Sequence, residues 1–557
     1  MKPAFKISIR PVWIPLLLMA ATVCAQQVSF ERILNANKEP QNWLTYGGTF
    51  FNQRYSLLNQ ITTDNVKNLE LQWVLQVRSM DGTTKFEATP LVVDGVMYTV
   101  KPPTPAYEVV ALDAATGRIY WTYSYTPAES RTCCGRNNKG LAIQGDRLYL
   151  ATIDTHLISI DAKTGREIFN VKVESPNTGL ASDYSFTVTP LVVKDKVIVG
   201  PAGGEYGIRG YVAAFDAKSG NEKWRFHVIP EPGEPGHETW GGNDSWKNGG
   251  GSIWTPGSYD PELNLVYWGT GNAGPDWNGD PRPGDNLYTC SVVALDADTG
   301  KLKWHYQFSP HDEFDFDSTQ VPVLADIDWQ GKPRKVMLWA NRNGLFYVLD
   351  RATGEFLLGK PFVKVTWMSG FDAKGKPIRA VQSSTSGVQV YPGNQGGTNW
   401  YNPAFNPRTG LFYIPTWEET SSVFTKREQE YKPGVNYAGG GFTAVVGLTA
   451  TNTYTRTEDE GYYGSIKAVD VRTGDIKWAY KMSQVTDSGV LTTASNLVFA
   501  GGREGYFFAL DARDGKLLWK SMLGGQVANG PITYAVNGRQ YVSVAAGNGL
   551  FTFALRQ

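Results

Sequence analysis

The chain lacks several features that would assign it to common functional classes. It has no net charge, with 53 basic and 53 acidic residues among 557, so nothing favours a nucleic acid or an anionic membrane as its partner. A Cys-x-x-Cys-His motif is absent, which excludes a covalently attached haem on this chain. No Pro/Ser-rich linker or charged tract divides the sequence. These absences favour one large domain that handles a small molecule.

A strongly apolar run stands at the N-terminus. Three basic residues precede the apolar stretch 12–21, and Val23-Cys24-Ala25 matches a small-residue cleavage site. The run is too short for a membrane span, so we do not expect an integral membrane protein. We predict a signal peptide over residues 1–25, cleaved near Ala25, and export of the mature chain 26–557 to a compartment in which disulfides form.

Cysteine is scarce, and two of the four cysteines are adjacent. After removal of the signal peptide, Cys133, Cys134 and Cys290 remain. A bridge between neighbouring residues closes a small ring and strains the peptide that joins them. The dipeptide by itself leaves two interpretations open, a vicinal disulfide or two unrelated buried thiols. Cys290 lies in a strand-like apolar segment, and we expect it to be a buried thiol.

One short turn motif recurs along the chain. Its pattern is apolar-Asp-x-x-x-Gly-x-x-x-Trp or a close variant, in which Asp can bond the turn backbone and Gly supplies a positive φ, as in β-hairpins. An eighth, degraded copy ends at Trp73. The seven complete copies begin at Asp113, Asp161, Asp216, Asp296, Asp350, Asp470 and Asp511.

Repeats of this kind predict an all-β fold, an eight-bladed β-propeller that takes up residues 26–557. The tryptophans of the repeats are expected to dock as wedges between adjacent blades. Several repeats carry long insertions, and insertions on a rigid ring are where functional sites are built.

From about residue 43 to residue 555 the chain resembles the pyrroloquinoline quinone (PQQ)-dependent methanol and ethanol dehydrogenases. The resemblance rests on the turn repeats, the Cys133-Cys134 pair and the segments 204–211, 269–272 and 311–317, all in the family's order. It implies a periplasmic quinoprotein, an alcohol dehydrogenase that oxidises a primary alcohol to the aldehyde by hydride transfer to PQQ.

The resemblance also implies a set of cofactor contacts. In the family, PQQ lies between a strained vicinal disulfide and a tryptophan, which here correspond to Cys133 with Cys134 and to Trp254, and a flat aromatic floor suits a planar quinone. The other implied contacts are Glu87, Lys139, Thr187, Ala202, Gly203, Gly204, Ser252, Arg342, Asn399 and Trp400. Three positions depart from the methanol dehydrogenases, which have Arg, a small hydroxyl residue and Trp at the positions of Lys139, Ala202 and Asp487.

A metal ion beside the quinone is implied as well. Its ligands would be Glu205, Asn272, Asp315 and Asp317, an all-oxygen set that suits hard cations. The metal would act as a Lewis acid, Asp315 as the general base, and Arg342 as the group that stabilises developing negative charge. Asp317, two positions after the catalytic Asp, resembles the lanthanide-dependent members. The sequence therefore favours a lanthanide(III) ion, with Ca²⁺ as the alternative.

Two other classes share parts of this pattern. A sugar- or aldose-oxidising quinoprotein would use the same cofactor, but those families lack adjacent cysteines. A non-enzymatic propeller scaffold would keep the turns without a reason to hold Glu205, Asn272 and Asp315. We expect a small alcohol as substrate and a separate cytochrome c as electron acceptor. The sequence leaves the identity of the alcohol, a companion subunit and the oligomeric state open, a homodimer included.

Overall fold

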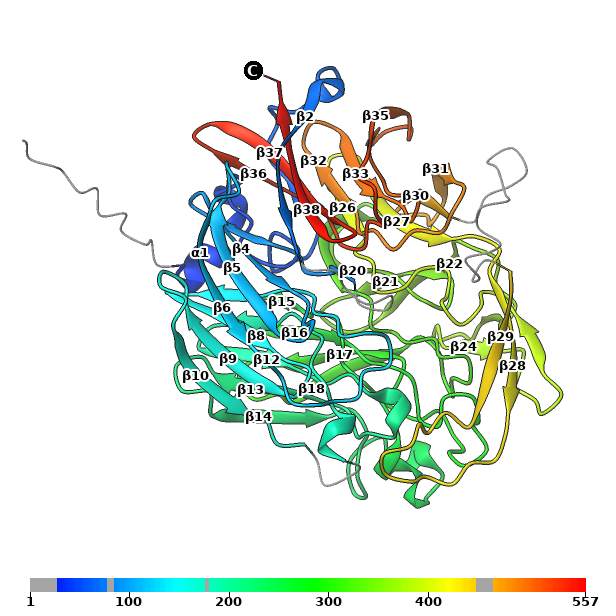
Figure 1. The fold of residues 1–557 in the computed structure, drawn as a ribbon. Coiled ribbons are helices and arrows are strands. Elements are labelled where there is room, and N and C mark those ends of the chain that lie inside the picture. The colour runs from blue at the N-terminus through cyan, green and yellow to red at the C-terminus, as the bar shows by residue number, and fades with distance from the viewer. Residues whose placement is uncertain (1–27, 78–84, 176–179, 447–463, 557) are drawn as a thin grey trace, which may run out of the picture.

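The computed structural model describes residues 28–77, 85–175, 180–446 and 464–556, which are built almost entirely of β-strands (Figure 1). The predicted signal peptide lies outside these residues. The single α-helix of the described part, α1 (Phe30–Leu34), begins after Ser29, whose hydroxyl accepts a hydrogen bond from the Arg32 N–H. The all-β fold class is therefore confirmed.

In the described part of the chain, seven sheets have four strands and an eighth has five, and each of the eight contains a row of four antiparallel strands. The first four sheets comprise β3 (Leu91–Val93), β4 (Val96–Lys101), β5 (Tyr107–Asp113) and β6 (Ile119–Tyr125); β7 (Ala142–Gln144), β8 (Arg147–Ala151), β9 (His156–Asp161) and β10 (Glu167–Lys172); β11 (Leu191–Val193), β12 (Lys196–Val199), β13 (Tyr211–Asp216) and β14 (Glu222–His227); and β15 (Ser258–Asp260), β16 (Leu265–Gly269), β17 (Ser291–Asp296) and β18 (Leu302–Gln307).

The remaining four sheets continue the same pattern. They comprise β19 (Val323–Trp329), β20 (Lys332–Ala340), β21 (Leu345–Asp350) and β22 (Phe356–Pro361); β26 (Ala404–Asn406), β27 (Leu411–Trp417), β30 (Gly464–Asp470) and β31 (Ile476–Met482); β32 (Leu491–Thr493), β33 (Leu497–Gly501), β34 (Tyr506–Asp511) and β35 (Leu517–Met522), with β1 (Tyr55–Ser56) added in parallel to β32; and β36 (Ile532–Val536), β37 (Arg539–Ala546) and β38 (Gly549–Leu555) with β2 (Leu69–Gln76).

Insertions carry the remaining elements. Two small sheets, visible at the right of Figure 1, come from the insertions on either side of β26 and β27. They contain β23 (Met368–Phe371) and β24 (Pro377–Arg379), and β25 (Val388–Val390), β28 (Ser421–Lys426) and β29 (Gly440–Val446). The short 3₁₀ turns are η1 (Ala36–Lys38), η2 (Val66–Asn68), η3 (Ala181–Asp183), η4 (Gly204–Tyr206), η5 (His237–Trp240) and η6 (Asp244–Asn248). Among the described residues, no helix has the length and apolar character that a membrane crossing requires.

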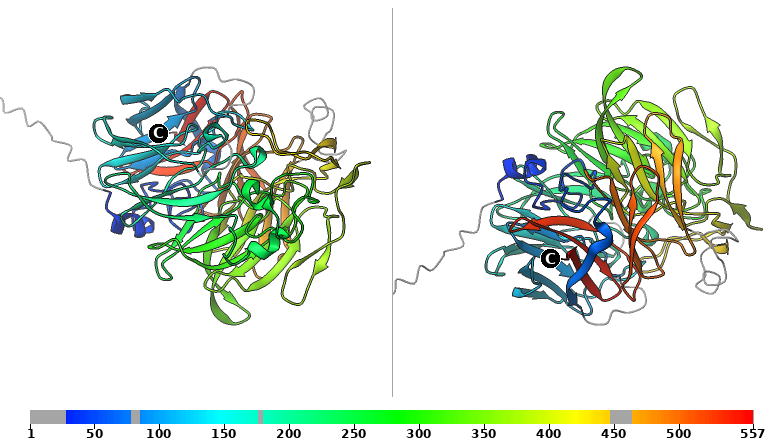
Figure 2. Two further views of the ribbon diagram at one scale, coloured as in Figure 1. Left: turned by 90° about the horizontal axis from the view of Figure 1, so that it is seen from below. Right: turned by 90° about the horizontal axis from the view of Figure 1, so that it is seen from above.

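The two ends of the chain meet in one sheet. The early strand β2 pairs antiparallel with β38, the last strand. In Figure 2 the colour runs around the molecule from blue through green to red, and the red strands return to the blue ones. The described chain thus returns to its starting point.

The repeat motif forms the turn between the last two strands of a sheet. Asp113 Oδ1 accepts hydrogen bonds from the backbone N–H groups of Ala115 and Thr116, each at 2.9 Å, and Gly117 has a φ of +74°. The predicted role of the aspartate is confirmed in this turn and in the others. The same pair of bonds is made by Asp161, Asp216, Asp296 and Asp350, and the first of them by Asp470 and Asp511.

Six of the seven turn glycines also receive an aromatic side chain from another sheet, and the seventh, Gly474, receives Leu358 and Lys360 instead. A Cβ on Gly117 would lie 2.9 Å from the Trp73 ring, whose Nε1 donates to the Ala114 carbonyl at 3.2 Å. Positive φ and lack of space therefore both select glycine here. The equivalent contacts join Trp121 to Gly165, Trp224 to Gly300 and Trp478 to Gly515.

The N-terminal segment 41–56 contacts the first strands of successive sheets. The carbonyl groups of Phe50, Phe51, Gln53 and Arg54 accept hydrogen bonds, in that order, from second residues of β15, β19, β26 and β32. Since four residues within a stretch of five reach four different sheets, the first strands of these sheets converge on a common axis.

Candidate active site

Eight of the predicted site residues, together with Asp487, share one position in the fold. They stand three to six residues before the first strand of a sheet, whereas Ala202, Gly203, Gly204, Glu205, Asn272 and Arg342 follow the second strand of one. Because these first strands converge, the segments that lead into them meet at one end of the fold. The segments are those of Glu87 before β3, Lys139 before β7, Thr187 before β11, Ser252 and Trp254 before β15, Asp317 before β19, Asn399 and Trp400 before β26, and Asp487 before β32.

Arg342 joins the two predicted catalytic-loop aspartates. Its Nη2 lies 2.6 Å from Asp315 Oδ2, and its Nη1 lies 2.7 Å from Asp317 Oδ2. Its Nε donates to the Asn394 carbonyl at 2.7 Å, which fixes the guanidinium. Asp317 Oδ1 accepts the backbone N–H of Asn272 at 2.7 Å. The structure therefore brings Asp315, Asp317, Asn272 and Arg342 into one network.

Two oxygens of the predicted metal ligands have no hydrogen-bond partner in the described residues. They are Glu205 Oε2 and Asn272 Oδ1; both atoms are buried, and an amide oxygen or an ionised carboxylate can only accept. Orphaned buried acceptors are rare and costly, and a cation satisfies them. In the described part of the chain, no three His, Cys, Asp or Glu side chains form a group that could hold a metal by themselves. A cation here would therefore also depend on Asn272 and on atoms of a bound cofactor.

Backbone packing around these oxygens leaves no room for larger side chains. A Cβ on Gly204 would lie 2.7 Å from Asn272 Oδ1, and one on Gly271 would lie 2.2 Å from Ser252 Oγ. The glycines of the two predicted segments thus let the backbone approach the site closely. Gly203, with a φ of +122°, is restricted in the same way by the Asp183 carbonyl.

The electrostatics of this group are dominated by burial. Burial raises the pKa of Glu205 to about 7, and the Asp317 carboxylate raises it while Arg342 lowers it. Burial also raises the pKa of Asp315 and of Asp317, against the opposing effect of Arg342. Carboxyl groups with such values hold protons readily unless a cation is near.

Sequence reasoning missed one acidic member of this group, Asp276. Its Oδ1 accepts the Asn272 Nδ2–H at 2.7 Å, and the residue is 2% exposed. Burial and the neighbouring carboxylates Glu205, Asp315 and Asp317 raise its pKa well above the ordinary value. The available signal was its place in the loop, four residues after a predicted metal ligand.

A second group of predicted residues surrounds Lys139. Its Nζ donates to Glu87 Oε2 at 2.9 Å, and both side chains are buried. The same Nζ lies 5.1 Å from the centre of the Trp254 ring and 5.0 Å from that of Trp400. The Lys139 N–H donates to the Thr187 carbonyl at 3.1 Å. Trp254 also hydrogen-bonds Asp317, so it connects this group to the acidic one.

Asp487 forms ion pairs with two further cations, Lys85 and Arg503. Lys85 Nζ lies 2.9 Å from its Oδ2 and Arg503 Nη2 lies 3.0 Å from the same atom. The Tyr401 hydroxyl and the Gln526 amide bond it as well. Burial alone would raise the pKa of Asp487, but the two cations outweigh burial and hold it at about 2. No local pattern marks Lys85 and Arg503, because they lie 402 and 16 residues from Asp487.

Cys133 and Cys134 form a disulfide between neighbouring residues, as the resemblance implies. Both are exposed. Asn137 links the bridge to the basic group, since its Nδ2 donates to the Cys134 carbonyl at 2.8 Å and its Oδ1 accepts the Lys85 N–H at 2.7 Å. The predicted free and buried thiol of Cys290 is confirmed.

Two predicted contacts show only local partners. Asn399 accepts the Trp400 N–H at 2.9 Å and donates to the Gln395 carbonyl at 3.1 Å. Ala202 forms an isolated bridge with Ser185. The assignment of Asn399 and Ala202 to the site therefore rests on their positions in the fold and not on contacts with other site residues.

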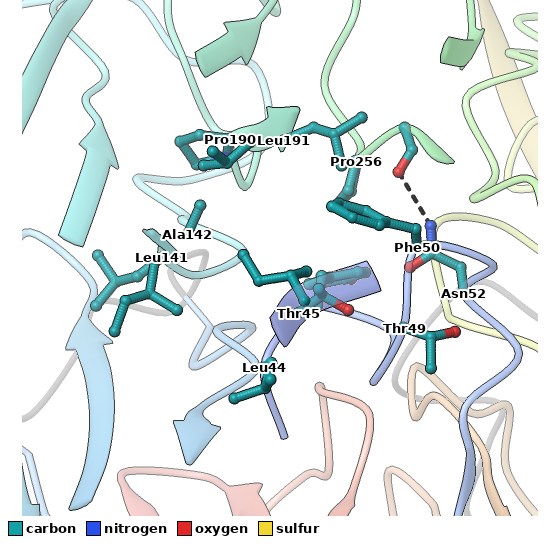
Figure 3. Close-up of a pocket in the computed structure, with 15 residues that line it drawn as sticks. Leu44, Thr45, Thr49, Phe50, Asn52, Leu141, Ala142, Pro190, Leu191 and Pro256 are labelled. Carbon is teal, nitrogen blue, oxygen red and sulfur yellow. Dashed lines mark hydrogen bonds between the residues drawn. The ribbon is translucent and has the colours of Figure 1, made fainter. Parts of the chain in front are cut away.

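An apolar pocket lies elsewhere in the fold (Figure 3). It is lined by Leu44 and Phe50 of the N-terminal segment together with Leu141, Pro190 and Leu191 from the entries to β7 and β11. Asn52 closes its rim with a 3.0 Å bond to the Gly257 carbonyl. None of the predicted site residues lines it, so this pocket and the charged site are separate.

The sheets and the charged, tryptophan-walled site together fit the class of quinone-dependent dehydrogenases. A family described as PQQ, glucose/ethanol/alcohol dehydrogenase, beta-propeller domain, matches residues 43–366 and 374–542. The chain belongs to this family, which confirms both the β-propeller fold and the resemblance read from the sequence.

Relatives of known activity agree with the family. The chain is 39% identical over 561 residues to the quinohemoprotein alcohol dehydrogenase of Comamonas testosteroni, covering 96% of this chain and 77% of that protein. It is 35% identical to the lanthanide-dependent methanol dehydrogenase of Methylacidiphilum fumariolicum (strain SolV), covering 95% and 88%. A solved europium-containing methanol dehydrogenase superposes with a TM-score of 0.85 at 32% identity, covering 94% of this chain and all of that one.

Proposed function

We propose that the chain is a periplasmic quinoprotein that oxidises primary alcohols to aldehydes with PQQ and a metal ion. The observation that carries this proposal is the pair of orphaned oxygens, Glu205 Oε2 and Asn272 Oδ1, beside the Asp315–Arg342–Asp317 network. Unpaired buried polar atoms occur elsewhere in the described chain as well, but a scaffold would have no reason to group these two oxygens with two further carboxyl groups. The alternative of a sugar substrate is disfavoured because the two relatives and the solved structure described above are alcohol or methanol dehydrogenases.

The residues present fit the implied cofactor. Trp254 and Trp400 offer aromatic faces, and Lys139 between them offers a positive charge suited to a carboxylate. When bound, PQQ would supply an ortho-quinone that can accept hydride, and the metal ion would polarise a carbonyl of that quinone. Glu205, Asn272, Asp315 and Asp317 would hold that ion.

Asp315 would take the hydroxyl proton of the alcohol. Burial raises its pKa, which strengthens it as a base, while Arg342 at 2.6 Å keeps the carboxylate charged and fixes its orientation. Arg342 is held in turn by Asn394 and Asp317, so it is preorganised to stabilise negative charge that develops next to Asp315.

The metal is proposed to be a lanthanide(III) ion. Three predicted carboxylate ligands face one guanidinium, which leaves a surplus of negative charge that a trivalent ion balances better than Ca²⁺. Both oxygens of Asp317 already have donors, Arg342 and Asn272. The competing view is that Asp317 orients Arg342 around a calcium site.

The remaining parts of the proposal concern architecture and partners. The eight meander sheets would be the blades of one ring, closed by β2 against β38, with the repeat tryptophans docked on the next blade's turn glycine. Residues 1–25 would direct export, and electrons would pass to a separate cytochrome c.

The test is reconstitution of the purified chain with PQQ and a metal salt. We expect dye-linked oxidation of primary alcohols that requires both additions, with La³⁺ more effective than Ca²⁺. Oxidation of aldoses without oxidation of alcohols would contradict the proposal, as would a chain that binds neither PQQ nor metal.

A further inference from the structure

Asp276 is a buried carboxyl group without an ion-pair partner among the described side chains. It is 2% exposed, and its Oδ1 is bonded by the amide of Asn272 at 2.7 Å. No cationic side chain of the described residues forms an ion pair with it; the nearby Arg282 bonds Asn286 Oδ1 at 2.7 Å and the Pro275 carbonyl at 3.0 Å instead. An unpaired charge in a protein interior is strongly unfavourable unless a ligand compensates it.

The chemistry of Asp276 determines how the Asn272 amide lies. An ionised carboxylate can only accept hydrogen bonds, so the Nδ2 of Asn272 must face Asp276 and its Oδ1 must face the other way. In the structure this Oδ1 points toward the 204–205 segment, 2.7 Å from where a Gly204 Cβ would be, and has no partner in the described residues. Asp276 thus directs the only neutral oxygen among the predicted ligands toward Gly204.

We propose that Asp276 is a positioning and specificity-determining residue of the metal site, which orients Asn272 and adds a negative charge that favours a trivalent over a divalent ion. This inference rests on the metal centre proposed above. With Asp276 the site has four carboxyl groups, of which Asp315 and Asp317 pair with the Arg342 guanidinium, whereas Glu205 and Asp276 form no ion pair with a described side chain.

Two substitutions separate the charge from the orientation. Asp276→Asn keeps a hydrogen-bond acceptor and removes the charge, whereas Asp276→Ala removes both. Asp280→Asn is the matched control, because Asp280 lies in the same loop, has a 66% exposed side chain and pairs with Lys426 at 2.7 Å. Metal-free full-length chain, supplied with PQQ, is titrated with LaCl₃ or CaCl₂ by calorimetry.

We expect Asp276→Asn to weaken La³⁺ binding at least about tenfold, the usual scale for residues that orient a metal ligand. Ca²⁺ binding should fall by a smaller factor, because electrostatic attraction scales with the charge of the ion. Asp276→Ala should weaken both ions further, and Asp280→Asn should change neither. Equal losses for both ions in Asp276→Asn, or the same losses in Asp280→Asn, would overturn the inference.

Thermal unfolding supplies a second readout. Asp276→Asn should leave the unfolding midpoint of the metal-free chain unchanged or higher, since the substitution keeps a hydrogen-bond partner for Asn272 and breaks no ion pair, and it should reduce the added stabilisation by La³⁺. A residue with a purely structural role would lower the midpoint with and without metal, and this result would overturn the inference. If the unsubstituted chain binds neither ion, the proposed metal centre itself fails. If it binds La³⁺ and Asp276→Asn binds it equally well, only the role of Asp276 fails.

Discussion

Two charge clusters of opposite sign are connected by Trp254, whose ring lies 5.1 Å from Lys139 Nζ and whose side chain hydrogen-bonds Asp317. The acidic cluster has four carboxyl groups and one guanidinium, which pairs with two of them, whereas the basic cluster has three cations and two carboxylates. A buried surplus of either sign is costly, so each cluster calls for a ligand group of the opposite charge. The acidic cluster is Glu205, Asp276, Asp315, Asp317 and Arg342, and the basic cluster is Lys85, Glu87, Lys139, Asp487 and Arg503.

The clusters are near mirror images in their internal bonding. In one, a guanidinium is shared by two carboxylates, and in the other, the Asp487 carboxylate is shared by two cations. Burial acts on carboxyl groups of both, yet it raises the pKa of Glu205 to about 7 while that of Asp487 is about 2. The charge of the neighbouring groups therefore decides whether the pKa of a buried carboxyl group rises or falls. A metal ion at one end and the carboxylates of PQQ at the other match this division of charge.

The largest effect is expected in the acidic cluster, at the proposed base. Asp315→Asn should retain bound PQQ and lower turnover by at least about 10²-fold, since a positioned base contributes on that scale. Dye-linked alcohol oxidation at saturating metal measures it, with Asp280→Asn as the control that should keep full turnover. Near-normal turnover of Asp315→Asn would move the base to another residue of the cluster, such as Glu205.

In the basic cluster, the main expected effect of a substitution is on the free energy of unfolding. Asp487→Asn leaves Lys85 and Arg503 without their shared partner and should cost about 2–3 kcal/mol of unfolding free energy, less than for a dry ion pair because both cations are partly exposed. The control is Asp298→Asn, which removes a surface carboxylate that also pairs with two lysines and should cost less than about 1 kcal/mol.

The same variant tests the pKa of Asp487. Because its pKa in the folded chain lies below the ordinary value, its contribution is present above pH about 4 and is lost as the pH falls toward about 2. Urea unfolding of the parent and of Asp487→Asn should therefore differ most near neutral pH and converge below pH 4. A difference that grows on acidification would mean that Asp487 is protonated at neutral pH.

A smaller effect is expected for metal preference. Asp317→Ala removes one charge from the acidic cluster and should narrow the preference for La³⁺ over Ca²⁺ by about tenfold. Titration of metal-free enzyme with each ion, followed by dye-linked oxidation, measures the ratio. Full activity with Ca²⁺ alone, unchanged by the substitution, would leave Asp317 as a residue that orients Arg342.

The sequence predicts those parts of the fold and the site that depend on residues close to one another along the chain. The turn aspartates and glycines are close in sequence and form the hairpins as predicted, and Glu205, Asn272 and Asp317 come from compact segments of the family pattern. The pairing of Lys85 and Arg503 with Asp487 could not be predicted from the sequence. The three residues lie in three different loops, and only the convergence of the first strands brings these loops together. Asp276 could have been predicted as a site residue because it lies four residues after Asn272, but its burial could not be predicted from the sequence.

The smallest change in stability is expected at the exposed edge of the basic cluster. Cys133→Ala opens a ring of two residues, and so short a closure contributes about 1 kcal/mol or less. Turnover should nevertheless fall, since the bridge is proposed to lie against the quinone. Unfolding midpoints and dye-linked activity of Cys133→Ala and Cys134→Ala should agree, because either one breaks the same bond. Asn137 connects the Cys134 carbonyl to the Lys85 backbone through its own side chain, so the Lys85–Asp487 pair should survive. A loss of stability as large as that of Asp487→Asn, with turnover preserved, would instead make the bridge a support of the basic cluster rather than part of the reaction site.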